Sequence, residues 1–234
     1  MKQGDLRKRE ILNTAELLFC KKGYEQTSIQ DILDELNTSK GSFYHHFISK
    51  ESLLEGICQK RAEQIWKEVE KSLNDHTGTI DILNTLLSGM IPLNGEKLSF
   101  MLMLMPVFLL PEGRSVRQCY SESLSFLFRP ALVSILRKGN ESGDLFCYQT
   151  EHTADLMLSV VHLFWIKIFE CILEAEAKDT RDDFSEMLHI TELYRMVLEQ
   201  TVSVPYGSIE LIGLPALKSL AELIHNHRTE VTRS

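Results

Sequence analysis

The sequence predicts an all-α protein, and three observations support this fold class. Apolar residues recur at the three- and four-residue spacing of a helix along most of the 234-residue chain. No segment sustains the alternating pattern of a half-buried strand. Gly, Pro and Asn separate the periodic segments, at the places where helices commonly end. We therefore expect helices throughout, in an N-terminal domain over residues 1–48 and a larger domain over residues 49–234.

The first predicted helix covers about residues 4–22. Ile11, Ala15 and Leu18 share one of its faces, which is expected to pack against the segment that follows. Gly23 comes directly after the helix, and glycine commonly ends helices because it tolerates a left-handed backbone. This helix is therefore expected to buttress the next part of the chain.

Residues 27–54 predict two short helices, a tight turn between them and the start of a third helix. Thr27 is the expected N-cap of the first short helix, because Gln30 follows three residues later in the pattern of a capping box. The apolar pattern stops at Asn37, and Ser39 is the expected cap of the second short helix. This arrangement is a helix-turn-helix.

The second short helix has one face for packing and one that is free to meet DNA. Phe43 and Phe47 lie four residues apart and share the packing face. The opposite face offers an ammonium and hydroxyls for phosphates, a glycine that admits close approach of the backbone, and an imidazole. An ordinary helical hairpin would show the same periodicity, so the prediction depends on the residue types. We expect major-groove contacts from Lys40, Gly41, Ser42 and His45, and phosphate contacts from Thr27, Ser28, Tyr44 and Lys50. Ser39, the expected cap, belongs to the same predicted DNA-binding set.

A long helix is predicted over about residues 49–76. Ser49 is its expected N-cap, so Lys50 and free backbone N–H groups would lie at a helix start that can hold a phosphate. Such a helix begins at the DNA backbone and ends inside the larger domain, so it could transmit movement between the two. A rigid spacer is the alternative.

Residues 7–57 closely resemble the N-terminal DNA-binding domain of the TetR/AcrR family of bacterial transcriptional regulators. The matching motifs are I-L-x-x-A-x-x-L-F over residues 11–19, Lys22-Gly23-Tyr24, and Ser39-Lys40-Gly41 leading into Phe43-Tyr44-His45-His46-Phe47. Many relatives have an Ala-Gly pair in the turn, where this chain has Leu36-Asn37. Because Asn tolerates a left-handed backbone, the turn is expected to survive.

The resemblance implies a ligand-responsive regulator, most often a repressor, that binds a palindromic operator as a homodimer and releases it when a small molecule occupies the C-terminal domain. In this family the last two long helices of the core domain form the dimer interface, and here these are about residues 151–177 and 183–202. The segment from residue 204 to residue 234 includes a further amphipathic helix whose role the sequence does not reveal. The effector, the operator and the regulated genes are equally beyond the sequence, as is the choice between repressor and activator.

Residues beyond 77 predict six more helices, near 79–90, 97–110, 114–139, 151–177, 183–202 and 215–228. Their middle part is rich in Met and aromatic residues, which make adaptable apolar walls. The residues expected to line an effector pocket there are Phe100, Met103, Phe108, Tyr120, Phe128, His162, Trp165 and Phe169. Stripes of this kind at helical spacing are also typical of an ordinary core. If they do line a pocket, the effector is hydrophobic or aromatic.

Composition bears on the function class. The chain contains 25 Lys and Arg residues and 33 Asp and Glu residues. Residues 1–50 contain eight of the basic residues and seven of the acidic ones, so the N-terminal part is less acidic than the rest. The five cysteines are widely spaced, and no metal-ligand spacing, cofactor fingerprint or Ser/His/Asp cluster is present. We therefore expect no metal, no cofactor and no enzyme activity. A helical small-molecule binding or carrier protein without regulatory DNA binding is the alternative.

Neither apolar stretch predicts a membrane span. Residues 98–110 are too short for the ~20 residues that a spanning helix needs, and Pro106 is expected to interrupt them. Residues 154–173 contain His162, Lys167 and Glu170. No signal peptide opens the chain, so we expect a cytoplasmic protein without membrane contact.

Overall fold

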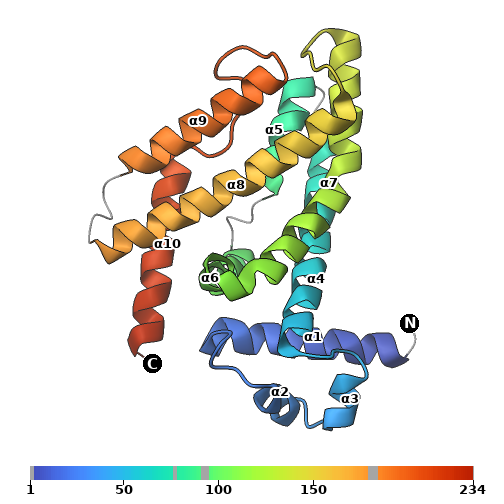
Figure 1. Ribbon diagram of the computed structural model, residues 1–234, viewed down its shortest axis with the longest axis vertical. Helices are drawn as coiled ribbons and strands as arrows, with labels where there is room; N and C mark the ends of the chain where they lie inside the picture. The colour runs from blue at the N-terminus through green and yellow to red at the C-terminus, as the bar shows by residue number, and fades with distance from the viewer. Residues whose placement is uncertain (1–2, 76–77, 91–94, 179–183, 234) are drawn as a thin grey trace. The chain divides into compact units, whose positions relative to one another are not determined.

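The structure is a computed structural model that describes all residues except 1–2, 76–77, 91–94, 179–183 and 234. The described residues form ten α-helices and two short 3-10 turns, with no strand among them (Figure 1). The predicted all-α class is confirmed. The chain divides into two compact units, one of residues 1–64 and 92–123 and the other of residues 65–91 and 124–234. The functional boundary expected at residue 48 stays a prediction.

The first unit contains the helix-turn-helix. Its helices are α1 (Gln3–Lys22), α2 (Ile29–Glu35), α3 (Lys40–Tyr44), the first part of α4 (Lys50–Ser72), α6 (Gly95–Leu109) and the first part of α7 (Arg114–Ser142), with a 3-10 turn at Pro111–Gly113. Helix α1 packs against α2 and α6. The buried apolar residues of the small helices include Ile11, Ala15, Phe19, Ile32, Leu33, Phe43 and Phe47.

Two residues with positive φ set the path of the helix-turn-helix. Gly23 ends α1 at φ +90°, and its N–H donates to the carbonyl oxygen of Phe19 at 2.9 Å. Asn37 lies between α2 and α3 at φ +47°, which is the left-handed conformation expected from the sequence. The next N–H, from Thr38, donates to the carbonyl oxygen of Leu33 at 3.0 Å. The tight turn therefore survives with Asn in place of Gly.

The second unit consists of the end of α4, a 3-10 turn at Leu73–Asp75, α5 (Thr79–Gly89), the rest of α7, α8 (Thr150–Ala177), α9 (Ser185–Thr201) and α10 (Leu214–Arg233). Helix α8 packs along α9, and the rings of Phe164 and Tyr194 meet between them at 5.6 Å. Glu199 is buried, and its carboxylate accepts a hydrogen bond from the Ile209 N–H at 3.0 Å. This bond fixes the connection between α9 and α10.

Two prolines lie inside continuous helices, although the sequence analysis expected Pro106 to interrupt its helix. Helix α6 continues past Pro106 to Leu109, and α7 contains Pro130 in its interior. The prediction that Pro106 interrupts the helix is therefore wrong. A proline removes one N–H donor and crowds the preceding turn, and the burial of apolar residues along α6, such as Leu104 and Val107, favours the continuous helix over a break.

Helix α8 is long and apolar enough to cross a membrane by length and composition alone. This is weak support for a membrane span, because the core helix of a soluble protein passes the same test. Ala154, Val161 and Ile168 on one side of α8 are fully buried. The charged residues Asp155 and Lys167 of the same helix are exposed. The helix has the amphipathic pattern of a core helix packed on α9.

Candidate functional site

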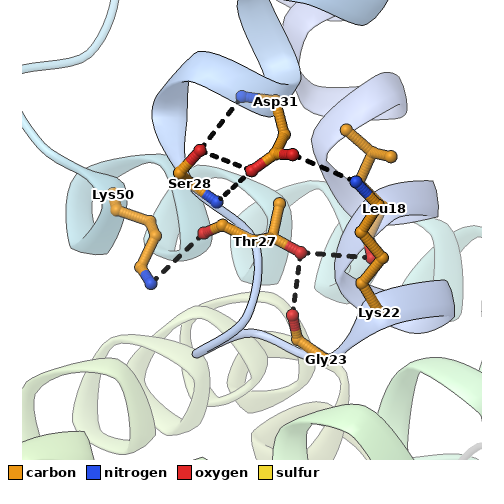
Figure 2. A network of polar contacts seen from close by, with 7 residues as sticks. All are labelled: Leu18, Lys22, Gly23, Thr27, Ser28, Asp31 and Lys50. Atoms are coloured by element: carbon orange, nitrogen blue, oxygen red, sulfur yellow. Dashed lines mark hydrogen bonds and ion pairs between the residues drawn. The ribbon is translucent and has the colours of Figure 1, made fainter.

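Helix α2 begins one residue later than the sequence predicted. The N-cap is Ser28, and the prediction of Thr27 as cap is wrong. Ser28 Oγ accepts a hydrogen bond from the Asp31 N–H at 3.1 Å, and Asp31 Oδ2 accepts one from the Ser28 N–H at 2.8 Å (Figure 2). Asp thus takes the place of Glu or Gln in a capping box. The sequence pattern fitted both registers, because Gln30 follows Thr27 at the same spacing as Asp31 follows Ser28.

Asp31 also joins α2 to the end of α1. Its Oδ1 forms an ion pair with Lys22 Nζ at 3.1 Å (Figure 2). The side-chain hydrogen bond from Ser28 contributes most to holding the pKa of the Asp31 carboxyl well below its usual range, followed by the backbone bond from Ser28 and the bond from Lys22. The start of α2 is therefore fixed by a carboxylate with partners on both sides.

Thr27 lies inside the domain rather than on its surface. Its side chain is 0 % exposed, and its hydroxyl donates to the carbonyl oxygen of Gly23 at 2.8 Å (Figure 2). The carbonyl oxygen of Leu18, at 3.3 Å, is a second acceptor for the same hydroxyl. Thr27 therefore ties the segment before α2 to the last turn of α1. The burial and pairing of this hydroxyl do not support the phosphate contact expected from Thr27, which stays a prediction. Ser28 is exposed, although its hydroxyl serves the capping box.

Helix α3 presents the predicted DNA-binding face. Ser39 is its N-cap, and Ser39 Oγ accepts a hydrogen bond from the Ser42 N–H at 3.3 Å. Phe43 is fully buried and packs against the Phe47 ring at 6.0 Å. The residues of α3 and its end that the structure leaves exposed are Lys40, Gly41, Tyr44 and His45, with Ser42 half-buried. Their contacts with DNA stay predictions.

Gly41 and Tyr44 suit this face in different ways. A Cβ atom at Gly41 would meet only Ser39 Oγ, at 3.9 Å, so packing inside the protein does not require a glycine there. The bare backbone is open to close approach from outside. Tyr44 is 51 % exposed while its ring edge packs on Phe43 at 5.3 Å. The Tyr44 side chain is thus half-exposed and rests on a buried neighbour.

Lys50 has partners that the sequence did not predict. Lys50 Nζ donates to the carbonyl oxygens of Tyr24 at 3.1 Å and Thr27 at 3.4 Å, and it lies 4.2 Å from the centre of the Tyr24 ring. Figure 2 shows this side chain reaching from the start of α4 to the segment before α2. A phosphate contact from Lys50 would compete with these acceptors. Nothing in the sequence spacing signals the bridge, because Lys50 and Tyr24 are 26 residues apart.

A buried ionic cluster joins α1 to α4 in the same unit. The Glu16 side chain is largely buried and forms ion pairs with Lys60 Nζ at 2.6 Å and with Arg61 Nε. The Arg61 guanidinium also lies over the Phe100 ring of α6, 5.5 Å from its centre. Sequence reasoning missed this cluster. The available signal was an acidic residue beside Ala15 and Leu12 on the apolar side of the first helix.

The predicted effector-lining residues fall into the two compact units. In the first unit, Phe100, Met103, Phe108 and Tyr120 are all buried. The Tyr120 ring lies 6.4 Å from that of Phe100 and 5.9 Å from that of Phe108. The Tyr120 hydroxyl is buried without a hydrogen-bond partner among the described residues.

In the second unit, Phe128, Trp165 and Phe169 are buried and His162 is half-buried. Phe128 packs edge-to-face against Trp66 at 5.1 Å, and Trp165 lies 6.0 Å from Phe169. The indole N–H of Trp165 is buried and has no partner among the described residues. The sequence analysis did not single out Trp66, the aromatic partner of Phe128.

Helices α8 and α9 expose apolar side chains at helical spacing. On α8, Leu156 and Leu163 are seven residues apart and each is 51 % exposed. On α9, Leu193 is 58 % exposed, and the other exposed apolar residues are Leu188, Met196 and Val197. Helices α8 and α9 pack along one another, and we call their exposed apolar side chains together the α8–α9 face.

Comparison with known proteins agrees with this architecture. The family model for bacterial regulatory proteins of the tetR family matches residues 11–57. An uncharacterized HTH-type transcriptional regulator of Bacillus subtilis is 26 % identical over 223 residues, which are 88 % of this chain and 74 % of that protein. The HTH-type transcriptional repressor KstR2 of Rhodococcus jostii is 34 % identical over 34 % of this chain and 40 % of its own.

A solved structure shares the fold of nearly the whole chain. The transcriptional regulator FadR of Bacillus subtilis, solved in complex with stearoyl-CoA, superimposes with a TM-score of 0.53. It is 17 % identical, and the match covers 85 % of this chain and 99 % of that one. At this identity the likeness concerns the fold alone.

Proposed function

We propose, from the premise that this chain belongs to the tetR family of bacterial regulatory proteins, that it is a homodimeric repressor that releases a palindromic operator when a small hydrophobic or aromatic effector binds. It is a transcriptional regulator and not an enzyme. The observation that carries the proposal is the outer face of α3. Its exposed residues stand on a buried base made of Phe43 and Phe47.

The chemistry of α3 supports contact with a DNA duplex. Lys40 supplies a charge for phosphate or a guanine edge, and Ser42 and His45 supply hydrogen-bonding groups for the major groove. We expect Tyr44 to contact a phosphate. We keep Lys40, Gly41, Ser42, Tyr44 and His45 as DNA contacts, and we assign to Thr27 and Lys50 the task of holding α2 and α4 in place.

The α8–α9 face supports a homodimer. Exposed leucines recur on two adjacent helices, and apolar patches on a protein surface commonly mark interaction sites. A second copy of the chain would bring the same face and bury the leucines of both. A dimer also presents two α3 helices, and successive major grooves lie about 34–36 Å apart.

The buried aromatic residues support an apolar effector. Phe100, Phe108 and Tyr120 pack together in one unit, and Phe128, Trp165 and Phe169 are buried in the other. The FadR structure shows that a protein of this fold binds a long acyl chain as stearoyl-CoA. Repression is supported by the relative KstR2, which is named a repressor. We expect this chain to act in the bacterial cytoplasm, where the operator DNA is.

Selection of bound sequences from random duplex DNA tests this function. The purified chain is expected to enrich a palindrome and to bind it with an affinity that falls steeply with salt, because several phosphates are neutralised at once. Sedimentation at the same protein concentrations reports whether the bound species is a dimer. Weak binding without sequence preference would favour a helical small-molecule carrier instead.

A further inference from the structure

We propose that Tyr120 and Arg61 recognise a carboxylate on an otherwise apolar effector, and that this carboxylate replaces Glu16 as the partner of Arg61. The inference rests on the proposed function, which it deepens by naming the polar group of the effector and the ion pair through which binding acts. All of the residues involved belong to one compact unit.

The Tyr120 hydroxyl is a buried donor that the described residues leave unpaired. Tyr120 is 3 % exposed, and its hydroxyl has no partner among the described residues. A buried polar group without a partner costs stability and is uncommon in native proteins. A phenylalanine would pack against the same rings without that cost. The hydroxyl therefore suits a ligand atom that accepts its hydrogen bond.

The surroundings of Tyr120 are apolar on the side of α6. The rings of Phe100 and Phe108 lie 6.4 Å and 5.9 Å from that of Tyr120, and both phenylalanines are buried. Arg117 donates to the carbonyl oxygen of Phe108, which holds the end of α6 against the start of α7. A ligand that reaches the Tyr120 hydroxyl is therefore expected to have an aromatic or aliphatic body.

Arg61 supplies a positive charge next to this group. Its guanidinium lies 5.5 Å from the centre of the Phe100 ring, which is itself in contact with Tyr120. Burial and the nearby Cys58 raise the pKa of Tyr120, and the charge of Arg61 acts on the hydroxyl in the opposite direction. A hydroxyl donor and a guanidinium at one apolar group match a carboxylate, which accepts hydrogen bonds and pairs strongly with arginine.

Arg61 is now paired with Glu16, so an effector carboxylate would compete with Glu16 for the guanidinium. Its carboxylate is bound by Arg61 and Lys60, and the side chain of Glu16 is buried. If the ligand takes over Arg61, only Lys60 still holds Glu16 to α4. Helix α1 carries Ile11, Ala15 and Phe19, on which the helix-turn-helix packs. The exchange therefore loosens the attachment of α1 to α4, and DNA affinity is expected to fall when the ligand binds.

The test uses the full-length protein with defined probes. The probes are benzoate, phenylacetate, octanoate and decanoate, each paired with its primary amide, which has nearly the same shape and no charge. Calorimetry measures their binding, and fluorescence anisotropy with the DNA selected above measures release. Carboxylates are expected to bind and to lower DNA affinity, and the matching amides to bind at least about tenfold more weakly, because hydrogen bonds to charged groups are the stronger ones.

Three variants separate a binding role from a structural one. Tyr120→Phe removes only the hydroxyl, so it is expected to weaken carboxylate binding at least about tenfold while it raises the melting temperature. Glu16→Gln removes the competing carboxylate and is expected to tighten carboxylate binding and to weaken DNA binding. Tyr148→Phe, at a highly exposed tyrosine in the other unit, is the matched control with no effect on either.

The outcomes are distinguishable from failure of the proposed function. Equal binding of amides and carboxylates, no binding of any carboxylate, or a Tyr120→Phe protein that keeps the wild-type response would each overturn the carboxylate site. Unchanged carboxylate affinity in Glu16→Gln would overturn the exchange. Absence of sequence-selective DNA binding before any probe is added would refute the regulator function itself.

Discussion

The ammonium of Lys50 lies 3.1 Å from the carbonyl oxygen of Tyr24 and over the ring of the same residue, so one side chain joins the start of α4 to the segment before α2. A lysine at a helix start next to a DNA-reading domain invites assignment to a phosphate. The contacts favour a structural role instead, because two carbonyl oxygens and an aromatic face already satisfy the charge.

We therefore expect Lys50→Met to lower the free energy of unfolding by about 1 kcal/mol and to weaken DNA binding indirectly. The slope of log affinity against log salt should stay unchanged, because no phosphate contact is lost. Lys40→Met is the matched comparison, with unchanged stability and a slope reduced by about 1. A reduced slope in Lys50→Met would show that Lys50 reaches a phosphate after all.

The register of the α2 cap can be tested by urea denaturation. Ser28→Ala should cost about 1 kcal/mol, because the Asp31 N–H loses its acceptor. Thr27→Val keeps the shape and removes a buried hydroxyl, and a cost of about 1 kcal/mol is expected there too. Gln30→Ala should change stability by less than about 0.5 kcal/mol, as for an exposed surface position. A larger loss at Gln30 than at Ser28 would restore the register that the sequence favoured.

Asp31 predicts a pH-dependent contribution to stability. The pKa of its carboxyl is depressed in the folded state by bonds from Ser28 and Lys22, so the ionised form stabilises the fold above the unfolded value of about 3.9. That contribution disappears as the pH falls below about 4 toward the lower folded pKa. Asp31→Asn should therefore lower the melting temperature more at pH 7 than at pH 3. An equal difference at both pH values would contradict the assignment.

Tyr44 is expected to hold DNA without choosing its sequence. Tyr44→Ala should weaken binding to all duplexes by a similar factor, while the order of preference among them stays the same, because a phosphate contact carries no base information. Competition with a pool of half-site variants measures both quantities. Tyr206→Ala, at an exposed tyrosine in the other unit, should leave DNA affinity unchanged. A changed preference would place Tyr44 at a base edge.

The α8–α9 face predicts the effect of one charge. Leu163→Glu puts a carboxylate into the patch and should shift the protein from dimer to monomer in sedimentation experiments, with loss of operator affinity. Phe126→Glu, at a more exposed apolar residue on α7, is the control that should leave the oligomeric state unchanged. A dimer that survives Leu163→Glu would move the interface elsewhere.

Sequence reasoning succeeded where the pattern is local. The packing face of α3 and the left-handed turn at Asn37 follow from residue types and short spacings, and both are present in the structure. It failed where two registers fit equally, as at Thr27 and Ser28, and where burial of neighbouring apolar residues outweighs a local breaker, as at Pro106. Contacts between residues far apart in the chain, such as Lys50 with Tyr24, leave no periodic signal.

Helix α3 contains only five residues, from Lys40 to Tyr44. Few side chains on so short an element can touch base edges, so one copy carries little sequence information. A bacterial regulator must find its target among on the order of 10⁶ or more competing sites. One recognition helix of this length cannot supply that discrimination. If two symmetric helices must both match, the probability of a chance match is the square of that for one helix. The brevity of α3 therefore favours the proposed homodimer, in which two copies of this helix share the recognition of one operator.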